Sequence, residues 1–325
     1  MKKLLLIAAA CVALASCVKN EVIPEPADKK LISYQTLVKP ETTRAAEVYN
    51  GADFKASALK VAEGATWPTT TGVYFDGVTV TDDVAGYVGQ WTTDPACYWP
   101  MSGGLVFYAH SPATVVAETL VSPWTYTFTN YSMDNDVDFM VAEIEKGADS
   151  KGLKENNVPV KFGHKLTKVV VKVCVAEIIG GATYTLKSIV FNNLGDAATF
   201  TKDVNGVEDW SDPVNFNKNY TIFNGTLNVT AAPQDVAITK EFYLPHTLVN
   251  NAHMVVTYNV AEPGLGNKDH VKTVMFSDIH HPDTAEWVKN NQVTYTLTIG
   301  AKERIIWDTP TIPTGWTEVG YSVAI

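Results

Sequence analysis

Charged residues are scarce in this chain, and the sequence has few cysteines and only one long apolar run. Asp, Glu, Lys and Arg make up 18% of the 325 residues, and the formal net charge is -10 at pH 7. Nucleic-acid binding needs a clustered basic surface, so this balance argues against a nucleic-acid partner. The apolar run lies at the amino terminus, and no later run approaches the length of a membrane-spanning helix.

The four cysteines leave little scope for a metal site or a disulfide framework. Cys11 lies within the apolar run and Cys17 follows it. Cys97 and Cys174 are then the only pair that a disulfide could join; we expect two free buried thiols, with a disulfide as the alternative. Zinc clusters need several closely spaced ligands, so we expect no metal and no other cofactor.

The first residues have the pattern of an export signal. Two lysines precede the apolar run from Leu4 to Leu14, which is too short for a permanent membrane helix. Leu14-Ala15-Ser16-Cys17 then has the form of a lipobox, in which the Cys17 thiol takes up a diacylglycerol. We predict a lipoprotein precursor lipidated at Cys17; the alternative is an ordinary secretory signal cut near Ala15 or Ser16.

Thr, Val and aromatic residues are abundant in the rest of the chain, which is typical of β-sheet rather than of amphipathic helices. Short alternating segments separated by Pro, Gly and Asn turns favour antiparallel sandwiches. Strands are expected at 31–38, 158–163, 169–175, 184–191, 226–230, 236–244, 253–260, 271–276 and 293–299. A short helix is expected at 285–290.

Four segments of the first half, taken in order, resemble the fimbrillin family of pilin-like subunits from the surface fimbriae of Bacteroidetes. They are Cys97-Tyr98-Trp99-Pro100, Leu105 to Pro112, Asp138 to Ala142 and Val160 to Val169. The second half matches only in general pattern. The resemblance implies an all-β fold with two transthyretin-like antiparallel β-sandwich domains in tandem, and a structural protein rather than an enzyme.

The resemblance also implies five successive segments in the chain. Residues 1–17 would be the signal peptide and lipobox, and 18–44 a propeptide with a removable first strand at 31–38. The two sandwich domains would be 45–177 and 178–300, with their boundary beside the turn at Gly180 and Gly181. Residues 301–325 would form a donor-strand tail.

Family members, by this resemblance, polymerise by strand exchange after proteolysis. An arginine-specific protease cuts a loop, the first strand leaves, and the carboxy-terminal strand of a neighbour fills the groove. Arg44 and Ala45 lie in a loop-like context of small residues after the first strand, so we predict processing between them. The expected donor residues are Ile305, Trp307, Ile312, Val319, Tyr321, Val323 and Ile325. The sequence leaves open which part of the tail enters the groove, and the alternative is that the tail folds back onto its own domain.

On this interpretation the chain is a structural subunit of surface fimbriae, a stalk pilin that supports adhesion and biofilm formation. Its expected partners are other copies of itself, tip and anchor pilins, and the arginine-specific protease. The lipid would hold the precursor at the cell outer membrane, and the mature chain would lie in a cell-surface fimbrium. The alternative is a non-polymerising surface lipoprotein or tip adhesin that binds a glycan or a host protein.

Signals for other chemistry are incomplete. Asp134, Asp136 and Asp138, together with Glu145, copy the ligand spacing of a calcium loop, but Phe139 stands where the sharp turn needs glycine. An extracellular hydrolase is the least favoured function, because its candidate nucleophiles lack the required strand-turn-helix context. The remaining candidates are His280-His281 with Asp283 as metal ligands, and Ser102 and Ser111 as nucleophiles.

Overall fold

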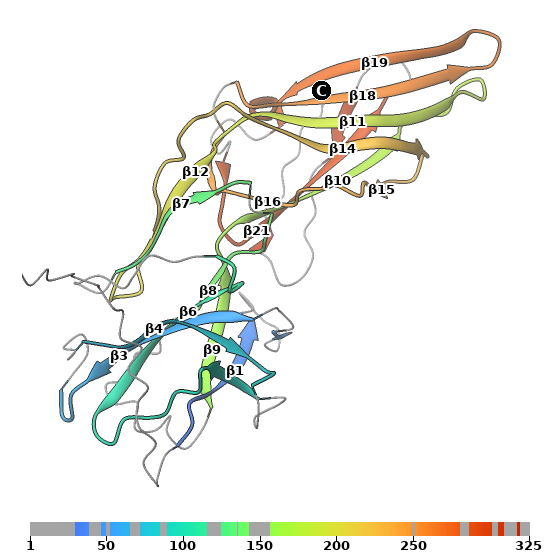
Figure 1. The fold of residues 1–325 in the computed structure, drawn as a ribbon. Helices are drawn as coiled ribbons and strands as arrows, with labels where there is room; N and C mark the ends of the chain where they lie inside the picture. The colour runs from blue at the N-terminus through green and yellow to red at the C-terminus, as the bar shows by residue number, and fades with distance from the viewer. Residues whose placement is uncertain are drawn as a thin grey trace, which may run out of the picture.

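The structure is a computed structural model. It describes residues 30–38, 47–49, 53–65, 72–84, 90–115, 125–134, 136–142, 157–248, 251–279, 286–300, 305–308 and 317–318. These residues form an elongated molecule built almost entirely of strands, with the one short helix α1 (Phe276–Ile279) (Figure 1). Within them, no helix is long and apolar enough to cross a membrane.

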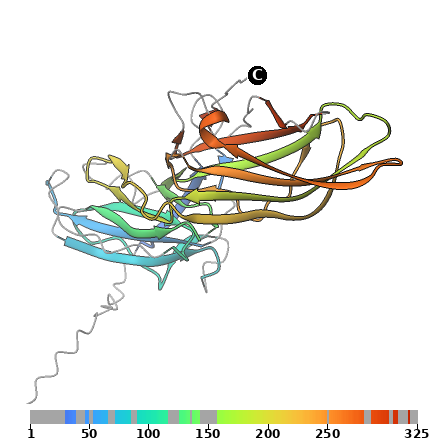
Figure 2. The same ribbon diagram turned by 90° about the horizontal axis from the view of Figure 1, so that it is seen from above.

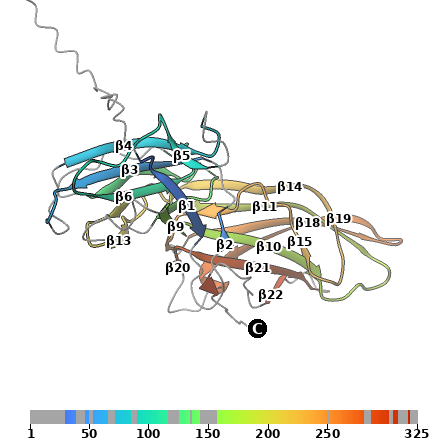
Figure 3. The same ribbon diagram turned by 90° about the horizontal axis from the view of Figure 1, so that it is seen from below.

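The N-terminal part of the molecule is a sheet that closes on itself. Its strands are β1 (Ser33–Val38), β2 (Glu47–Val48), β3 (Phe54–Val61), β4 (Gly72–Thr81), β5 (Trp91–Asp94), β6 (Gly104–Ser111), β8 (Met140–Ala142) and β9 (Val158–His164). They pair in the order β2-β1-β5-β4-β3-β6-β8-β9, and a further pairing of β1 with β9 closes the ring. Figure 3 shows β1 running from β5 at one end to β2 at the other, with β9 beside it. β1 is therefore the strand that joins β5 to β9.

The central strand β6 is buried on both faces because two cores meet at it. All eight of its residues are buried. Leu105, Phe107 and Ala109 belong to the core inside the ring, whereas Val106 and Tyr108 belong to a larger core that continues into the rest of the molecule. Successive residues of a strand point to opposite faces, so a strand between two cores needs a continuous apolar run.

The C-terminal part is a sandwich of two sheets, and Figure 2 shows it end to end with the ring. One sheet is antiparallel, in the order β14-β11-β18-β19, with β11 (Thr183–Leu194), β14 (Lys218–Val229), β18 (His253–Glu262) and β19 (Gly266–Met275). The other is built on β10 (Thr167–Val175) and β21 (Asn291–Ile299), which run parallel. Short strands extend this second sheet: β15 (Gln234–Asp235), β16 (Phe242–Tyr243), β22 (Ile305–Asp308) and β23 (Thr317–Glu318).

The inner faces of β10 and β21 explain why these two strands lie side by side. The inner residues are all nearly or fully buried: Val169, Val171, Val173 and Val175 in β10, and Val293, Tyr295, Leu297 and Ile299 in β21. They pack in one core with Leu186, Ile189 and Phe191 of β11. Trp287 is fully buried in the same core and its Nε1 donates a hydrogen bond of 3.0 Å to the Tyr295 hydroxyl.

A three-stranded sheet joins the two parts of the molecule. β7 (Tyr126–Ser132) pairs with β12 (Ala197–Lys202), which pairs with β13 (Glu208–Trp210). A separate two-stranded pair is formed by β17 (His246–Thr247) and β20 (Glu286–Trp287). In the chain, β7 lies between the ring strands β6 and β8. Its buried residues nevertheless belong to the core of the second part of the molecule.

The predicted all-β fold is confirmed. Period-2 alternation correctly predicted the strands β1, β9, β10, β11, β18, β19 and β21 and part of β14. Two predictions are wrong. Residues 286–290, expected to be helical, contain β20 and a turn. The segment 236–244 is not one strand: only β16 forms in it, because the Thr239 amide leaves the sheet edge to donate to the Ile222 carbonyl of β14 at 2.8 Å.

The change from ring to sandwich falls between β9 and β10. β10 lies within the range 45–177 expected for the first domain, and it pairs with β21 of the sandwich. The change of sheet therefore falls at Lys165 and Leu166, between β9 and β10. The limits of the export segment, the propeptide and the tail stay predictions.

Candidate functional site

The strand β1 is held on both edges. On one edge Tyr34–Val38 pairs in parallel with Val158–Phe162 of β9. On the other edge β1 pairs antiparallel with β5 at its start and with β2 at its end. The residues before it are also bound: the Ile32 amide donates to the Cys97 carbonyl at 3.0 Å. Without β1, the backbone groups along one edge of β9 would lose their partners.

Alternate side chains of β1 enter the core inside the ring. Ile32 is 0% exposed, Tyr34 3% and Thr36 6%. Ser33 and Gln35 point the other way, and the Ser33 hydroxyl donates a hydrogen bond of 2.6 Å to Asn157. Burial of Ile32 and Tyr34 stabilises the ring by about 1.5–3 kcal/mol each.

Tyr34 occupies an aromatic pocket. Its ring meets Phe54 edge-on, with centroids 5.7 Å apart and an interplanar angle of 88°, and Phe107 at 5.9 Å and 85°. These are favourable edge-to-face arrangements. The Tyr34 hydroxyl is buried without a hydrogen-bond partner. Burial raises the pKa of Tyr34 well above its usual value, and the nearby Cys97 adds to the shift.

The predicted processing site follows β1 directly. Leu37 and Val38 pair antiparallel with Val48 and Glu47, so β1 and β2 are neighbouring strands joined by residues 39–46. Arg44 and Ala45 belong to that connection and lie outside the described residues, as does Cys17. A cut within residues 39–46 would leave β1 attached to the ring by non-covalent contacts alone.

The start of the predicted donor tail pairs with its own chain. Ile305–Asp308 forms β22, which lies antiparallel to Thr296–Ile299 of β21. Thr317 and Glu318 form β23, which pairs in parallel with the first residues of β21. The structure thus places Ile305 and Trp307 at an edge of their own sandwich, as in the alternative for the tail. Ile312, Val319, Tyr321, Val323 and Ile325 lie outside the described residues.

A buried ionic cluster lies where β9 leads into β10. Glu208 accepts hydrogen bonds from Lys165 and Lys202, both at 2.8 Å, and Lys289 lies 3.3 Å from the same carboxylate. Burial raises the pKa of Glu208, but the charges of Lys165 and Lys202 outweigh it and the pKa falls to about 2. Burial lowers the pKa of Lys165 to about 8. This cluster links β12, β13 and the connection between the ring and the sandwich.

The three aspartates whose spacing resembles that of a calcium loop each have a different partner. Asp134 pairs with Lys218 at 2.8 Å, and Asp136 accepts backbone hydrogen bonds from Glu241 and Phe242. Asp138 pairs with His164 at 2.8 Å. The carboxylates therefore do not converge, and the described part of the chain holds no group of three or more potential metal ligands.

The other candidates for chemistry have structural surroundings. The Ser111 hydroxyl hydrogen-bonds with the buried Tyr49 hydroxyl, and burial lowers the pKa of His110 to about 4. Cys97 and Cys174 are both free; Cys174 is buried and Cys97 is half-buried, so the alternative of a disulfide is wrong. Glu145, His280, His281 and Asp283 lie outside the described residues.

Two features of the site were missed at the sequence level. The closure of the ring by β1 depends on a parallel pairing between residues more than a hundred positions apart, for which alternation gives no signal. The cluster around Glu208 was missed because its lysines come from three distant segments. A weak signal for the cluster was present, since Lys165 stands between two strongly apolar strands.

Comparison with known proteins identifies the family. The family model described as fimbrillin-like matches residues 43–316. The chain belongs to the fimbrillin-like family. This is a family of fimbrial and cell-adhesion proteins, so the chain has a fimbrial or adhesion role at the cell surface. A search of curated proteins finds no match.

Solved structures confirm that the fold of this fimbrillin-like chain is shared. A fimbrial protein from Bacteroides vulgatus matches with a TM-score of 0.60 and 15% identity, over 89% of this chain and 100% of the other. A candidate cell-adhesion protein from Bacteroides uniformis matches with a TM-score of 0.52 and 19% identity, over 87% of this chain and 98% of the other. At these identities the likeness concerns the fold.

Proposed function

We propose that this chain is a stalk subunit of a fimbrium that polymerises by strand exchange. In this scheme the precursor is cut between Arg44 and Ala45, β1 leaves the ring, and the tail of another copy takes its place. The observation that carries the proposal is the position of β1, which joins β5 to β9 and ends at the connection that contains Arg44. A domain that keeps its first strand permanently would have no use for a protease site in the connection directly after that strand.

The lipid anchor and the removable strand lie on the same side of the proposed cut. Cys17 precedes β1, so cleavage after Arg44 releases the lipidated residue together with the strand. The lipid would deliver the precursor to the outer membrane, and the remaining chain of 281 residues (325 minus 44) would enter the fimbrium. β1 would keep the precursor from assembling before the cut.

The choice of arginine decides the outcome of cleavage. The chain has two arginines, Arg44 and Arg304. A cut after Arg304 would detach every proposed donor residue, whereas a cut after Arg44 keeps them all. An arginine-specific protease must therefore reach Arg44 and spare Arg304, which directly precedes β22 at the edge of the sandwich.

The pairing of β22 with β21 supports a donor role for the later part of the tail. Ile305 and Trp307 belong to a strand that already completes an edge of its own sheet. Pro310 and Pro313 lack an N–H group and would interrupt a strand that must pair on both edges. Among the proposed donor residues, Val319, Tyr321, Val323 and Ile325 lie beyond both prolines.

The experiment is cleavage of the purified precursor that carries Arg304→Lys, which leaves Arg44 as the only site for an arginine-specific protease. We expect SDS-resistant ladders, and filaments by electron microscopy, after the cut. Arg44→Lys in the same background should stay uncut and monomeric, and truncation after Asp308 should be cut but should not form ladders. If the cut parent protein remains monomeric at every concentration and temperature, strand exchange is wrong.

The other possible role is that of a non-polymerising lipoprotein or tip adhesin that binds a glycan or host protein. It would leave the uncut monomer as the active form. A glycan array with the uncut monomer tests it, and an empty array beside a positive ladder assay would exclude it in favour of the stalk.

A further inference from the structure

A cavity of about 300 Å³ lies in the C-terminal part of the molecule, where β13 meets the short pair formed by β17 and β20. Two segments, 208–213 and 286–289, form most of its lining, and Pro245 and His246 complete it. The lining is rich in carboxylates and holds one ammonium group; these charged residues are Glu208, Asp209, Asp212 and Glu286, with Lys289. The cavity therefore carries an excess of negative charge.

Three of these carboxylates have no counter-charge. Glu208 is the carboxylate of the buried cluster, and its lysine partners include Lys289, 3.3 Å away. Asp209, Asp212 and Glu286 are exposed, and none of them forms an ion pair with any residue that the structure describes. A recess lined by charge of one sign concentrates ions of the opposite sign. The cavity is thus suited to a cation.

His246 adds a buried hydrogen-bond acceptor that has no partner. The residue is 8% exposed, and its Nδ1 lies 2.7 Å from the Leu244 carbonyl oxygen. A carbonyl can only accept, so Nδ1 carries the hydrogen, and burial, which lowers the pKa of His246, keeps the ring neutral. Nε2 is then the polar atom that the ring can offer to the cavity, and it is buried without a hydrogen-bond partner. An N–H group of a ligand would satisfy it.

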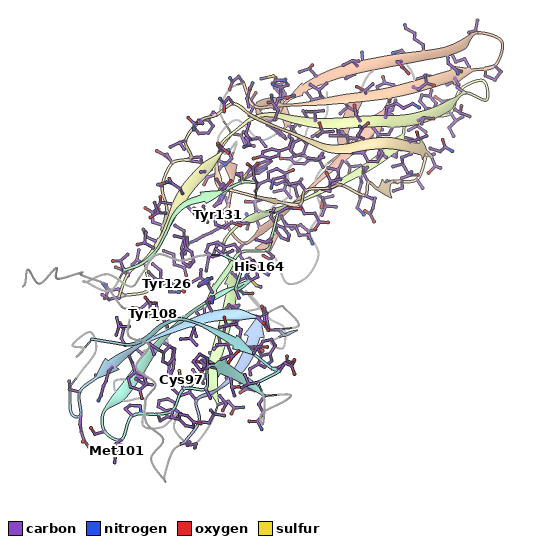
Figure 4. All side chains as sticks on the ribbon, viewed as in Figure 1. Cys97, Met101, Tyr108, Tyr126, Tyr131 and His164 are labelled. Atoms are coloured by element: carbon purple, nitrogen blue, oxygen red, sulfur yellow. The ribbon has the colours of Figure 1, made fainter. Side chains whose placement is uncertain are left out.

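Trp210 gives the cavity a rigid aromatic wall. Its Nε1 donates a hydrogen bond of 2.9 Å to the Lys165 carbonyl. Its indole packs against Phe200 and against Tyr131, which is labelled in Figure 4, with ring centroids 5.2 Å and 5.7 Å away. The residue is half-buried and lines the cavity. An indole held in this way attracts a cation to its face.

We propose that this cavity binds a guanidinium group, the side chain of an arginine that a partner protein presents. The lining groups without a partner among the described residues, three carboxylates and the His246 Nε2, are all acceptors, so the ligand has to supply donors. A guanidinium carries a positive charge and five N–H donors in one plane, and it stacks on aromatic rings. The site uses neither β1 nor the tail, so it applies to a stalk subunit and to a monomeric adhesin alike.

Binding of short peptides to the uncut precursor tests the proposal. The probes are N-acetyl-glycyl-arginyl-glycine amide and the same peptide with citrulline, which is flat but neutral. The readout is the NMR signal of the Trp210 indole N–H, assigned through its loss in Trp210→Phe. We expect the arginine peptide to shift this signal with a Kd on the order of millimolar, and the citrulline peptide to bind about tenfold more weakly or less. Equal binding of the two peptides, or a shift with neither, would overturn the proposal.

Two double variants separate the cavity from the general charge of the chain. Asp209→Asn with Asp212→Asn should weaken binding of the arginine peptide about tenfold, because two acceptors of the lining lose their charge. Asp235→Asn with Glu241→Gln removes the same charge elsewhere on the sandwich, where each carboxylate pairs with a lysine. This control should stay within about twofold of the parent. An equal loss in both double variants would mean that no specific site exists.

His246→Phe tests the buried acceptor, because it keeps an aromatic ring between Phe216 and Trp287 without a nitrogen. We expect binding of the arginine peptide to weaken about threefold or more. Unchanged binding in the folded variant would contradict the role of Nε2. If the Trp210 signal shows that this variant does not fold, the double variants decide alone.

Titration with methyl glycosides of glucose, galactose and mannose distinguishes a cation site from a sugar site. We expect no shift of the Trp210 signal, and a shift with a glycoside but not with the arginine peptide would overturn the proposal. All of these measurements use the uncut monomer. A failed ladder assay therefore leaves the cavity assignment untouched, and a failed titration leaves strand exchange untouched.

Discussion

Each part of this molecule contains a pair of parallel strands, and the two pairs differ in the length over which the strands are paired. In the ring, β1 lies parallel to β9 over Tyr34–Val38. In the sandwich, β21 lies parallel to β10 over Gln292–Ile299, which is a longer pairing. β9 and β10 follow each other along the chain with only two residues between them. The continuous stretch β9–β10 therefore pairs with one strand over a short length, β1, and with another over a longer length, β21.

The two partner strands also differ in the chemistry of their buried tyrosines. Tyr295 of β21 has a hydroxyl that accepts the Trp287 Nε1 hydrogen bond, whereas the Tyr34 hydroxyl has no partner. The inner face of β21 is otherwise aliphatic, but β1 includes Thr36. The buried tyrosine of β21 therefore has a hydrogen-bond partner for its hydroxyl, whereas the buried tyrosine of the proposed removable strand has none.

Removal of β1 should have the largest effect and tests this contrast directly. A chain that begins at Ala45 loses the burial of Ile32 and Tyr34, which is about 3–6 kcal/mol in total. We expect its first urea transition to move to lower concentration, with recovery on addition of a peptide of residues 30–38. As a control, a chain that lacks residues 319–325 should unfold like the parent. An unchanged transition without β1 would mean that the ring does not depend on it.

Glu208→Gln should have the next largest effect, because it removes the carboxylate that joins the ring to the sandwich. Lys165 and Lys202 would remain buried without their partner, and breaking a buried ion pair costs about 3–5 kcal/mol. The control is Glu241→Gln, which breaks an exposed pair with Lys168 and should cost less than about 1 kcal/mol. Urea unfolding followed by fluorescence measures both. Equal losses would contradict a special role for the junction.

Acid should weaken the larger core, where His110 of β6 packs against Tyr126 and Phe128 of β7, before it affects Glu208. The folded pKa of His110 is about 4, below its usual 6.5, because burial disfavours the charged ring. The unfolded chain therefore binds the extra proton first as pH falls. The stability is complete above pH 6.5 and is lost toward pH 4, with about 2 kcal/mol lost by pH 5.

His110→Gln should flatten this part of the stability profile. For Glu208 the window lies lower, between the usual 4.5 and about 2. Measurements of the free energy of unfolding between pH 7 and pH 4.5 separate the two groups. A parent profile without slope between pH 6.5 and pH 5 would contradict the assignment to His110.

The smallest expected effects come from the two tyrosines and compare the strands atom by atom. Tyr295→Phe should cost about 1–3 kcal/mol, because the buried Trp287 N–H loses its acceptor. Tyr34→Phe should be neutral or slightly stabilising, because it removes a hydroxyl that has no partner. Thermal unfolding of the two single variants measures the difference. Equal losses would show that the Tyr34 hydroxyl is satisfied in solution.

The strands were the predictable part of this structure. In β10 and β21, Val169 to Val175 and Val293 to Ile299 place large apolar residues at every second position, so the face that meets the core could be identified, even though β21 is buried on both faces. In β6 the alternation is lost because both faces carry apolar residues. The helix expected at 285–290 was a wrong prediction, because a short segment that mixes apolar and polar residues is equally compatible with a short strand followed by a turn.

Pairing and charge were the unpredictable part. Alternation shows which face of a strand is buried, but it does not show which strand lies beside it. The parallel match of β1 with β9, and the transfer of β10 to the second sandwich, follow from tertiary packing alone. The tail could be recognised as strand-forming, but only the pairing of β22 with β21 distinguishes its first part from its last.

The direct succession of β9 and β10 has a mechanical consequence. In a fibre assembled as proposed, an incoming strand would bind along β9, and the outgoing tail would start from the edge of β21, whose neighbour is β10. A pull along the fibre would then pass lengthwise through one continuous backbone, with Lys165 and Leu166 as its only non-strand residues. Hydrogen bonds along both strand pairs would bear the load together in shear rather than open one at a time, and the Glu208 cluster would brace the point at which the load crosses between the two cores.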